Sequence, residues 1–279
     1  MTIQDRLHYA AENWKLTNIS TIYEKETRAV YQADAAEWGK VIIKINADKK
    51  ELFSEYSMLN AMKGSCCCAV FAFDTSLGII AEEQIIPGNV LREEKNPAKR
   101  VEIFSAVFHN IHPTLPVNNN YKTYIDWLAD ADRFCSINSV DNEIKKNMQT
   151  AHRIGKELFK KYQERVLLHG DLHHDNILQS SNHMYCMIDP KGIIGPEIFD
   201  LPRFILNEFD FAEAAEAKKH ISLIIQLISS RTGYHISDIT KLLFMETMLA
   251  HVWNLEDGNA SDAHHMKTAA ELMEERSVF

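Results

Sequence analysis

The sequence lacks long apolar runs and contains few cysteines, glycines and prolines. Its longest strongly apolar stretches, residues 66–73 and 221–228, are much shorter than the ~20 residues that a membrane-spanning helix needs. The N-terminal residues do not show the basic and then apolar pattern of a secretory signal. With 10 glycines and 7 prolines among 279 residues, collagen-like and low-complexity chains are excluded as well. We therefore expect a globular cytoplasmic protein with no membrane partner.

The five cysteines do not form a disulfide pattern. Three of them are consecutive, Cys66 to Cys68, and no Cys-x-x-Cys spacing occurs. Neighbouring cysteines are geometrically poor disulfide partners. We expect them to be reduced and to behave as small hydrophobic residues on a strand, with metal binding as the weaker alternative.

A surplus of basic residues is also missing. The chain has 30 Lys and Arg against 39 Asp and Glu, for a net charge of −9. A nucleic-acid partner is therefore not expected, because such proteins carry a basic surface. Residues 192–279 contain 7 basic and 14 acidic residues and account for −7 of that charge. This surplus fits a cationic small-molecule partner, or it only keeps the protein soluble, and both interpretations stay open.

The chain divides near Pro87 and Gly88 into two regions with different hydrophobic patterns. Before this point, short runs rich in Val, Ile and Tyr indicate strands, and apolar residues at helical spacing between Lys49 and Met62 indicate one helix. The expected strands are residues 14–19, 28–33, 41–46, 69–73 and 78–82. Afterwards longer helical patterns predominate, at residues 97–111, 121–134, 143–163, 212–229 and 239–255. We predict an α+β fold with an N-terminal lobe, residues 1–86, made of an antiparallel sheet and one helix. A larger, mostly helical lobe, residues 87–279, would follow.

Candidate catalytic residues are concentrated in one polar loop between two apolar runs, within residues 166–179. Phosphoryl transfer from a nucleotide needs a carboxylate that accepts the proton of the acceptor hydroxyl, and oxygen ligands for Mg²⁺. In kinases the base and an asparagine ligand lie five positions apart on one loop, and an aspartate ligand lies on the next hairpin. Asp171, Asn176 and Asp189 have this spacing.

A cation for the phosphates is expected in the first lobe. Lys44 interrupts an apolar strand, and Glu55 follows eleven residues later in the expected helix, where an ion pair could hold the ammonium in place. An edge-strand lysine that discourages aggregation is the alternative interpretation of Lys44. The polar loop favours the functional interpretation.

These motifs resemble the aminoglycoside phosphotransferase family. The similarity is strongest to its branch of aminoglycoside and hydroxyurea resistance kinases, and it extends from about residue 14 to residue 253. It is carried by three motifs: His169-Gly170-Asp171-x-His173-x-x-Asn176, Ile188-Asp189-Pro190-Lys191-Gly192 and Phe199-Asp200-Leu201. The resemblance implies a protein-kinase-like fold of two lobes and the use of ATP with Mg²⁺.

The resemblance also implies roles for individual residues. Asp171 would be the catalytic base, and Asn176 and Asp189 would hold Mg²⁺. Lys44 would contact the α- and β-phosphates, and Glu55 would anchor it.

Supporting roles are implied at the hinge and beneath the loop. The backbone from Glu83 to Ile85 would meet the adenine. Asp200 would accept backbone N–H bonds from the catalytic loop, and His169 would help to hold the shape of that loop.

Two positions depart from the family pattern. Residues 20–27, where a loop should cover the phosphates, contain no glycine, so hydroxyl groups would have to substitute or nucleotide affinity would be weak. Asp175 either adds negative charge near the acceptor or has no role.

We therefore expect an ATP- and Mg²⁺-dependent O-phosphotransferase. Its acceptor would be a hydroxyl of a small cationic molecule, either an aminoglycoside such as streptomycin or hydroxyurea. The alternative is a metabolite kinase for choline, homoserine or an amino sugar. Trp253 would line the acceptor site or belong to the core.

Other classes of function fit the sequence less well. Gly170 stands where protein kinases carry arginine, and no Ala-Pro-Glu segment follows Asp189. The loop histidines could suggest a transition-metal site, but no His-x-x-x-His pair supplies further ligands. A non-catalytic binding module is disfavoured because every chemically required side chain is present. The sequence predicts no particular oligomeric state.

Overall fold

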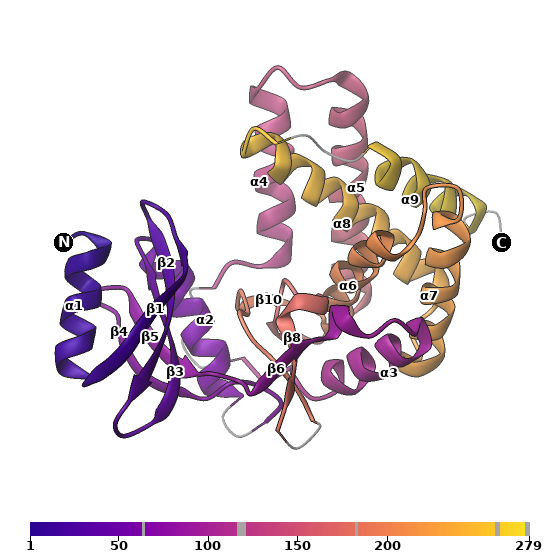
Figure 1. Ribbon diagram of the computed structural model, residues 1–279. Coiled ribbons are helices and arrows are strands. Elements are labelled where there is room, and N and C mark those ends of the chain that lie inside the picture. The colour runs from indigo at the N-terminus through magenta and orange to yellow at the C-terminus, as the bar shows by residue number, and fades with distance from the viewer. Residues whose placement is uncertain (63–64, 116–120, 182–183, 260–262, 277–279) are drawn as a thin grey trace. The chain divides into compact units, whose positions relative to one another are not determined.

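The protein, seen in a computed structural model, forms two compact units (Figure 1). The structure describes all residues except 63–64, 116–120, 182–183, 260–262 and 277–279. The first unit comprises Met1–Leu91 together with Asp175–Gly192, and the second comprises Arg92–His174 together with Ile193–Phe279. Asp175–Gly192 therefore packs with the N-terminal part of the chain, whereas the expected division at residue 86 assigns it to the second lobe. The functional division at residues 86 and 87 stays a prediction.

A five-stranded antiparallel sheet forms the body of the first unit, in the order β1-β2-β3-β5-β4. Its strands are β1 (Leu16–Glu24), β2 (Arg28–Ala35), β3 (Gly39–Asn46), β4 (Val70–Asp74) and β5 (Ile79–Glu83), and helix α2 (Lys49–Ala61) lies between β3 and β4 in the chain. The expected succession of three strands, one helix and two strands is confirmed. Because β1 continues to Glu24, only residues 25–27 remain as a turn where a loop over residues 20–27 was expected.

Helix α1 (Ile3–Asn13), which the sequence analysis did not predict, covers one face of the sheet. Its first turn is closed by Thr2 and Asp5, whose side chains accept each other's backbone N–H groups in a capping box. Val41, Ile43 and Ile45 of β3 are buried on this face. Because side chains alternate along a strand, Ile42 and Lys44 point to the opposite face of the sheet.

A smaller antiparallel sheet completes the first unit, in the order β6-β8-β9. It comprises β6 (Pro87–Val90), β8 (Ile177–Ser180) and β9 (Tyr185–Met187). Ile177 pairs with Met187 at the open end of the hairpin. The segment that precedes Ile177 and the segment that follows Met187 therefore lie side by side. The five cysteines are free, and burial raises the pKa of the Cys67 thiol to about 12.

The second unit is mostly helical, with one two-stranded sheet of β7 (Val166–Leu168) and β10 (Ile193–Gly195). Its helices are α3 (Pro97–Phe108), α4 (Tyr124–Ile137), α5 (Asn142–Lys161), α6 (Leu201–Asn207), α7 (Ala217–Thr232), α8 (Ile236–Glu256) and α9 (Ala263–Arg276). Helix α8 is buried along most of its length and packs against α4, α5, α6, α7 and α9. Gly155 lets α5 approach α4, because a Cβ atom there would lie 2.3 Å from Leu128 Cδ1. The predicted α+β class, with an N-terminal antiparallel sheet and a mostly helical second part, is confirmed.

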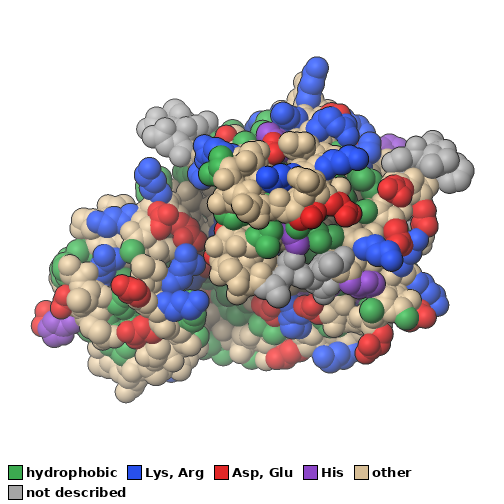
Figure 2. All heavy atoms as spheres, turned by 90° about the horizontal axis from the view of Figure 1, so that it is seen from above, with side chains coloured by type: hydrophobic (Ala, Val, Ile, Leu, Met, Phe, Trp, Pro, Cys, Tyr) green, Lys and Arg blue, Asp and Glu red, His purple; other side chains and the backbone are tan. Residues whose placement is uncertain are grey.

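The surface carries charges of both signs. On the face seen in Figure 2, Lys and Arg side chains are interspersed with Asp and Glu side chains in each unit. Among the residues that the structure describes, no helix has the length and apolar content required to cross a membrane.

Candidate active site

Lys44 lies in the first unit among three carboxyl groups. Its ammonium forms a very short ion pair with Glu55 of α2 and lies 3.1 Å from both Glu82 Oε2 and Asp189 Oδ1. The side chain is only 13% exposed. Burial alone would lower the pKa of Lys44, but the three carboxyl groups raise it, so the ammonium stays charged. Burial raises the pKa of Glu55 in spite of the ammonium beside it.

Asp189 joins this cluster from a strained position directly after β9. Its φ of +60° lies in the left-handed region, which residues other than glycine adopt rarely and often at functional sites. Its carboxylate also lies 3.2 Å from the Lys191 ammonium. Burial would raise the pKa of Asp189, but Lys44 and Lys191 lower it below its ordinary value. Asp189 is therefore an anion over the whole physiological pH range.

A backbone hydrogen bond of the hairpin holds Asn176 beside the segment that carries Asp189. The N–H of Ile188 donates to the Asn176 carbonyl at 3.0 Å, and the Asn176 side chain is mostly buried. Lys44, Asn176 and Asp189 all line one cavity of about 430 Å³ in the first unit. The fold thus brings to one place three of the residues that the sequence singles out, two from the loop and hairpin spacing and Lys44 from its position in an apolar strand.

The other end of the same cavity is formed by the segment that follows β5. Glu83, Ile85 and Gly88 line it, together with Ile22 of β1 and Leu178 of β8. Glu83 donates its backbone N–H to Ala69, whereas the backbone N–H of Ile85 donates to no described residue. An apolar slot with free backbone groups suits a flat heterocycle.

The residues at the charged end of this cavity suit Mg²⁺. Mg²⁺ prefers oxygen ligands and is usually held by one or two carboxylates together with substrate phosphates. An ionised Asp189 and the Asn176 amide supply such oxygens, and Lys44 supplies a cation for the phosphates. Within the described parts of the chain, no group of three or more His, Cys, Asp or Glu side chains could hold a metal by itself.

In the second unit, the loop after β7 is held by Asp200, as expected. Its carboxylate accepts the backbone N–H groups of His169 at 2.8 Å and Gly170 at 2.7 Å, and His112 Nε2 lies 2.9 Å away. Asp200 is 1% exposed. His169 is fully buried and its Nδ1 accepts the backbone N–H of Asp171 at 3.2 Å, so this histidine shapes the loop.

Asp171 is held by an arginine that the sequence analysis did not single out. Arg203 Nε of α6 lies 3.3 Å from Asp171 Oδ1, and Arg203 Nη2 lies 2.7 Å from Glu246 Oε1 of α8. The Tyr124 hydroxyl forms a very short hydrogen bond to the other oxygen of Glu246. Burial would lower the pKa of Arg203, but Glu246 and Asp171 raise it. Arg203 is therefore a fixed cation beside the candidate base.

The two adjacent loop histidines have different surroundings. His174 is fully buried, stacks on Phe204 with ring centroids 4.2 Å apart, and places Nε2 2.9 Å from Glu208. Glu208 also pairs with the buried Arg100 at 2.6 Å. His173 Nε2 lies 3.8 Å from Asp171 Oδ1. His174 Nε2 is engaged with Glu208, and among the described residues these histidines belong to no group of three or more His, Cys, Asp or Glu side chains that could hold a metal ion, so the structure gives no support to the alternative transition-metal site.

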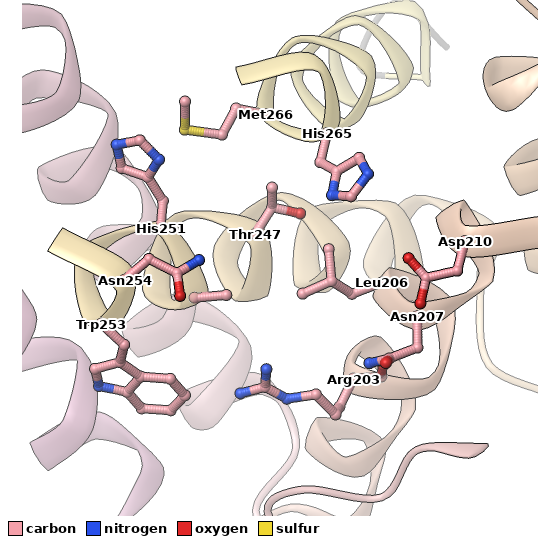
Figure 3. A pocket seen from close by; sticks show the side chains of 11 residues that line it. Arg203, Leu206, Asn207, Asp210, Thr247, His251, Trp253, Asn254, His265 and Met266 are labelled. Atoms are coloured by element: carbon pink, nitrogen blue, oxygen red, sulfur yellow. The ribbon is translucent and has the colours of Figure 1, made fainter. Parts of the chain in front are cut away.

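A second cavity, of about 280 Å³, lies in the second unit between α6, α8 and α9 (Figure 3). Arg203 forms part of its wall, so the residue that pairs with Asp171 also borders this cavity. Trp253 lines it too, with its ring 5.3 Å from the Arg203 guanidinium.

The expected site residues fall into two groups. The first unit contains Lys44, Glu55, Glu83, Ile85, Asn176 and Asp189. Asp171 belongs to the second unit. Glu82, Arg203 and Glu246 were missed, because a single charged residue becomes a signal only when its partner elsewhere in the chain is known.

Comparison with known proteins identifies the family. The family described as aminoglycoside/hydroxyurea antibiotic resistance kinase matches residues 13–258. A segment of 112 residues is 26% identical to streptomycin 3''-kinase of Klebsiella pneumoniae. That segment covers 39% of this chain and 42% of that relative, so the chain matches less than half of its length.

Solved structures of similar fold cover nearly the whole chain. Choline kinase LicA from Streptococcus pneumoniae has a TM-score of 0.70 and 14% identity, with 99% of each chain covered. A thermostable mutant of aminoglycoside phosphotransferase APH(4)-Ia, in a ternary complex with AMP-PNP and hygromycin B, has a TM-score of 0.72 and 13% identity. The alignment covers 98% of this chain and 99% of that one. These similarities confirm the fold, and the match over residues 13–258 shows that the chain belongs to the aminoglycoside/hydroxyurea antibiotic resistance kinase family, a family of small-molecule kinases.

Proposed function

We propose that this protein is an ATP- and Mg²⁺-dependent O-phosphotransferase that phosphorylates a hydroxyl group of a small molecule. The observation that carries the proposal is the cluster in the first unit. There the Lys44 ammonium lies between Glu55 and Asp189 at the charged end of a cavity that Asn176 also lines. A cation beside an ionised aspartate and an amide oxygen is the set of groups that a metal–triphosphate complex requires.

Nucleotide binding is assigned to the first unit. Lys44, held by Glu55, binds the α- and β-phosphates, and the backbone at Glu83 and Ile85 binds the adenine. The apolar lining between these two ends supports this assignment. Asn176 and Asp189 hold Mg²⁺, which neutralises charge on the phosphate oxygens when bound.

The chemical step is assigned to Asp171. Its carboxylate accepts the proton of the acceptor hydroxyl while the hydroxyl oxygen bonds to the γ-phosphorus. The bond from that phosphorus to the bridging oxygen breaks, and ADP leaves. Arg203 and Asp200 are positioning residues in this step, because one contacts the Asp171 carboxylate and the other holds the loop.

The acceptor candidates follow from family membership and charge. The first group is the aminoglycosides, streptomycin among them, and hydroxyurea. The alternative is a metabolite kinase of the same fold, whose acceptor is choline, homoserine or an amino sugar. A screen that measures ADP release from MgATP with each compound identifies the group.

Two variants test the assignment of the machinery. Asp171→Asn should lower acceptor-dependent ADP release by about 10²–10⁴-fold, the usual contribution of a general base, and should leave nucleotide affinity nearly unchanged. Lys44→Met should instead weaken MgATP binding. His8→Gln is the control, because His8 is 75% exposed on α1 and lines neither cavity. Normal turnover by Asp171→Asn would show that another group is the base.

A further inference from the structure

The cavity between α6, α8 and α9 is lined, among the described residues, by one arginine, one aspartate and several other polar side chains. Figure 3 shows its side chains arranged along α8, with α9 on one side and α6 on the other. Its lining residues are Arg203, Leu206, Asn207, Asp210, Thr247, Ala250, His251, Trp253, Asn254, His265 and Met266. Which ligand this cavity accepts depends on which of its polar groups are already paired within the protein.

Both acidic and basic side chains of the lining are already paired. Arg203 is held by Asp171 and Glu246. Asp210 pairs with the Arg92 guanidinium at 2.8 Å. Among the residues that the structure describes, the acidic surplus of residues 192–279, which suggested a cationic acceptor, contributes only Asp210 to this lining. An ammonium group entering the cavity would therefore meet no uncompensated carboxylate from the described residues.

Three polar side chains of the lining, all on α8, in contrast keep hydrogen-bonding capacity. Thr247, His251 and Asn254 lie at positions i, i+4 and i+7 of α8 and so share one face of the helix. His251 is 6% exposed, and neither of its ring nitrogens has a hydrogen-bond partner among the described residues. The Asn254 amide likewise bonds to no described side chain or backbone group. Thr247 donates to the Leu243 carbonyl and keeps its oxygen lone pairs.

A buried imidazole without partners is costly, by about 1–3 kcal/mol for each unsatisfied group. Such a cost is recovered when a ligand supplies the missing partners. Burial lowers the pKa of His251, so the ring is neutral at pH 7, with one nitrogen that donates and one that accepts. The Asn254 amide also both donates and accepts.

Hydroxyl groups match this lining better than ammonium groups do. A hydroxyl donates one hydrogen bond and accepts others, as an imidazole and an amide require, whereas an ammonium group only donates. The Trp253 indole adds an apolar surface for the C–H groups of a ring. The volume of about 280 Å³ lies at the lower limit of ligand pockets, which suits a single ring.

We propose that this cavity binds the reacting part of the acceptor as an uncharged ring rich in hydroxyl groups, of the size of a monosaccharide or a cyclitol. This rests on the proposed function, in which Asp171 accepts the proton of an acceptor hydroxyl. Arg203 connects the cavity with the candidate base, because it borders the cavity and contacts the Asp171 carboxylate. Any amino groups of a larger acceptor then lie outside the cavity.

Calorimetric titration of the full-length protein with matched rings tests the proposal. The pairs are D-glucose with D-glucosamine and scyllo-inositol with scyllo-inosamine, and in each pair one hydroxyl group of the first ring is replaced by an ammonium group at neutral pH. We expect the uncharged member of at least one pair to bind about tenfold more tightly than its amine, since an unpaired buried ammonium costs more than ~1.4 kcal/mol.

Variants of His251 connect this binding to the cavity. His251→Ala should weaken binding of the uncharged ring about tenfold, and His251→Gln, which keeps a donor and an acceptor, should restore most of the affinity. Asn254→Ala provides a second, less buried substitution, with a similar loss. His8→Gln should bind like the unmodified protein.

Three results would overturn the proposal. These are tighter binding of the amines, unchanged affinity in both His251→Ala and Asn254→Ala, and no saturable binding of any of the four rings. The proposed function is tested separately, by the slow hydrolysis of MgATP without acceptor and its loss in Asp171→Asn. If that loss occurs while no ring binds, the kinase assignment stands and the assignment of the cavity is wrong.

Discussion

Replacing Asp200 by Asn tests how the second unit holds its catalytic loop. Asp200 accepts the backbone N–H groups of His169 and Gly170, one on each carboxylate oxygen, and is almost fully buried. An asparagine side chain has nearly the same shape but offers only one oxygen. In either orientation its NH₂ group would face the backbone N–H of His169 or that of Gly170, and neither can accept a hydrogen bond.

The size of the effect follows from these two bonds. A hydrogen bond to a charged group contributes about 1.5–3 kcal/mol, and a buried unsatisfied donor costs about 1–3 kcal/mol. In Asp200→Asn neither backbone N–H group donates to a charged acceptor any longer, and at least one hydrogen-bond donor has no acceptor. We expect the free energy of unfolding to fall by about 3 kcal/mol. Turnover should fall by about 10²-fold, because a shift of about 1 Å in the base has that effect.

Urea unfolding followed by circular dichroism and by tryptophan fluorescence measures the first quantity, and acceptor-dependent ADP release measures the second. Asp257→Asn is the matched control, because Asp257 is exposed after the end of α8 and should change stability by less than about 0.5 kcal/mol. A loss below about 1 kcal/mol with unchanged turnover would contradict the role assigned to Asp200.

Other predictions concern the backbone, pH and the metal. Gly192→Ala should destabilise the first unit by more than about 2 kcal/mol, since φ is +60° and a Cβ atom would lie 2.4 Å from the Ser54 carbonyl oxygen. Gly39→Ala, also at positive φ but with open space around it, should cost only ~1 kcal/mol in the same urea titration. Burial lowers the pKa of His251 from its ordinary 6.5, so below that pH the folded chain binds fewer protons than the unfolded chain. Stability should therefore fall as pH decreases through this range, and less so in His251→Gln, as measured by unfolding at each pH. Asp189→Asn keeps a residue that tolerates positive φ but removes the charge, so turnover should need a higher Mg²⁺ concentration. An unchanged Mg²⁺ dependence would exclude Asp189 as a ligand.

Most of the sheet in the first unit could be predicted because its signals are local. The alternation around Ile43 and the helical spacing between Lys49 and Met62 depend only on neighbouring residues. Helix α1 has a local signal too, the capping box of Thr2 and Asp5, which the sequence analysis did not use. Strand β6 and the packing of Asp175–Gly192 with the first unit were not predictable in this way, because they depend on pairing between distant segments.

The residues of the candidate site also divide into those with a local sequence signal and those without one. The spacing of Asp171, Asn176 and Asp189 is a property of one stretch of chain, and a family pattern can identify it. The partners of Lys44 and Asp171 that were missed, Glu82 and Arg203, belong to no motif and have no distinctive spacing from the residues they contact. Their importance comes from tertiary packing, which spacing along the chain does not encode.

The surroundings of Lys44 have a consequence for which form of the nucleotide the protein accepts. Carboxyl groups already pair with the ammonium groups of Lys44 and Lys191, so neither lysine supplies uncompensated positive charge. A triphosphate that arrives alone must compete with these carboxyl groups for the two ammonium groups, whereas a triphosphate that arrives with a divalent cation brings compensating charge with it. The same side chains that hold the lysine in place thus discriminate against uncomplexed nucleotide, and ATP affinity measured in the presence of a chelator should be markedly lower than with Mg²⁺.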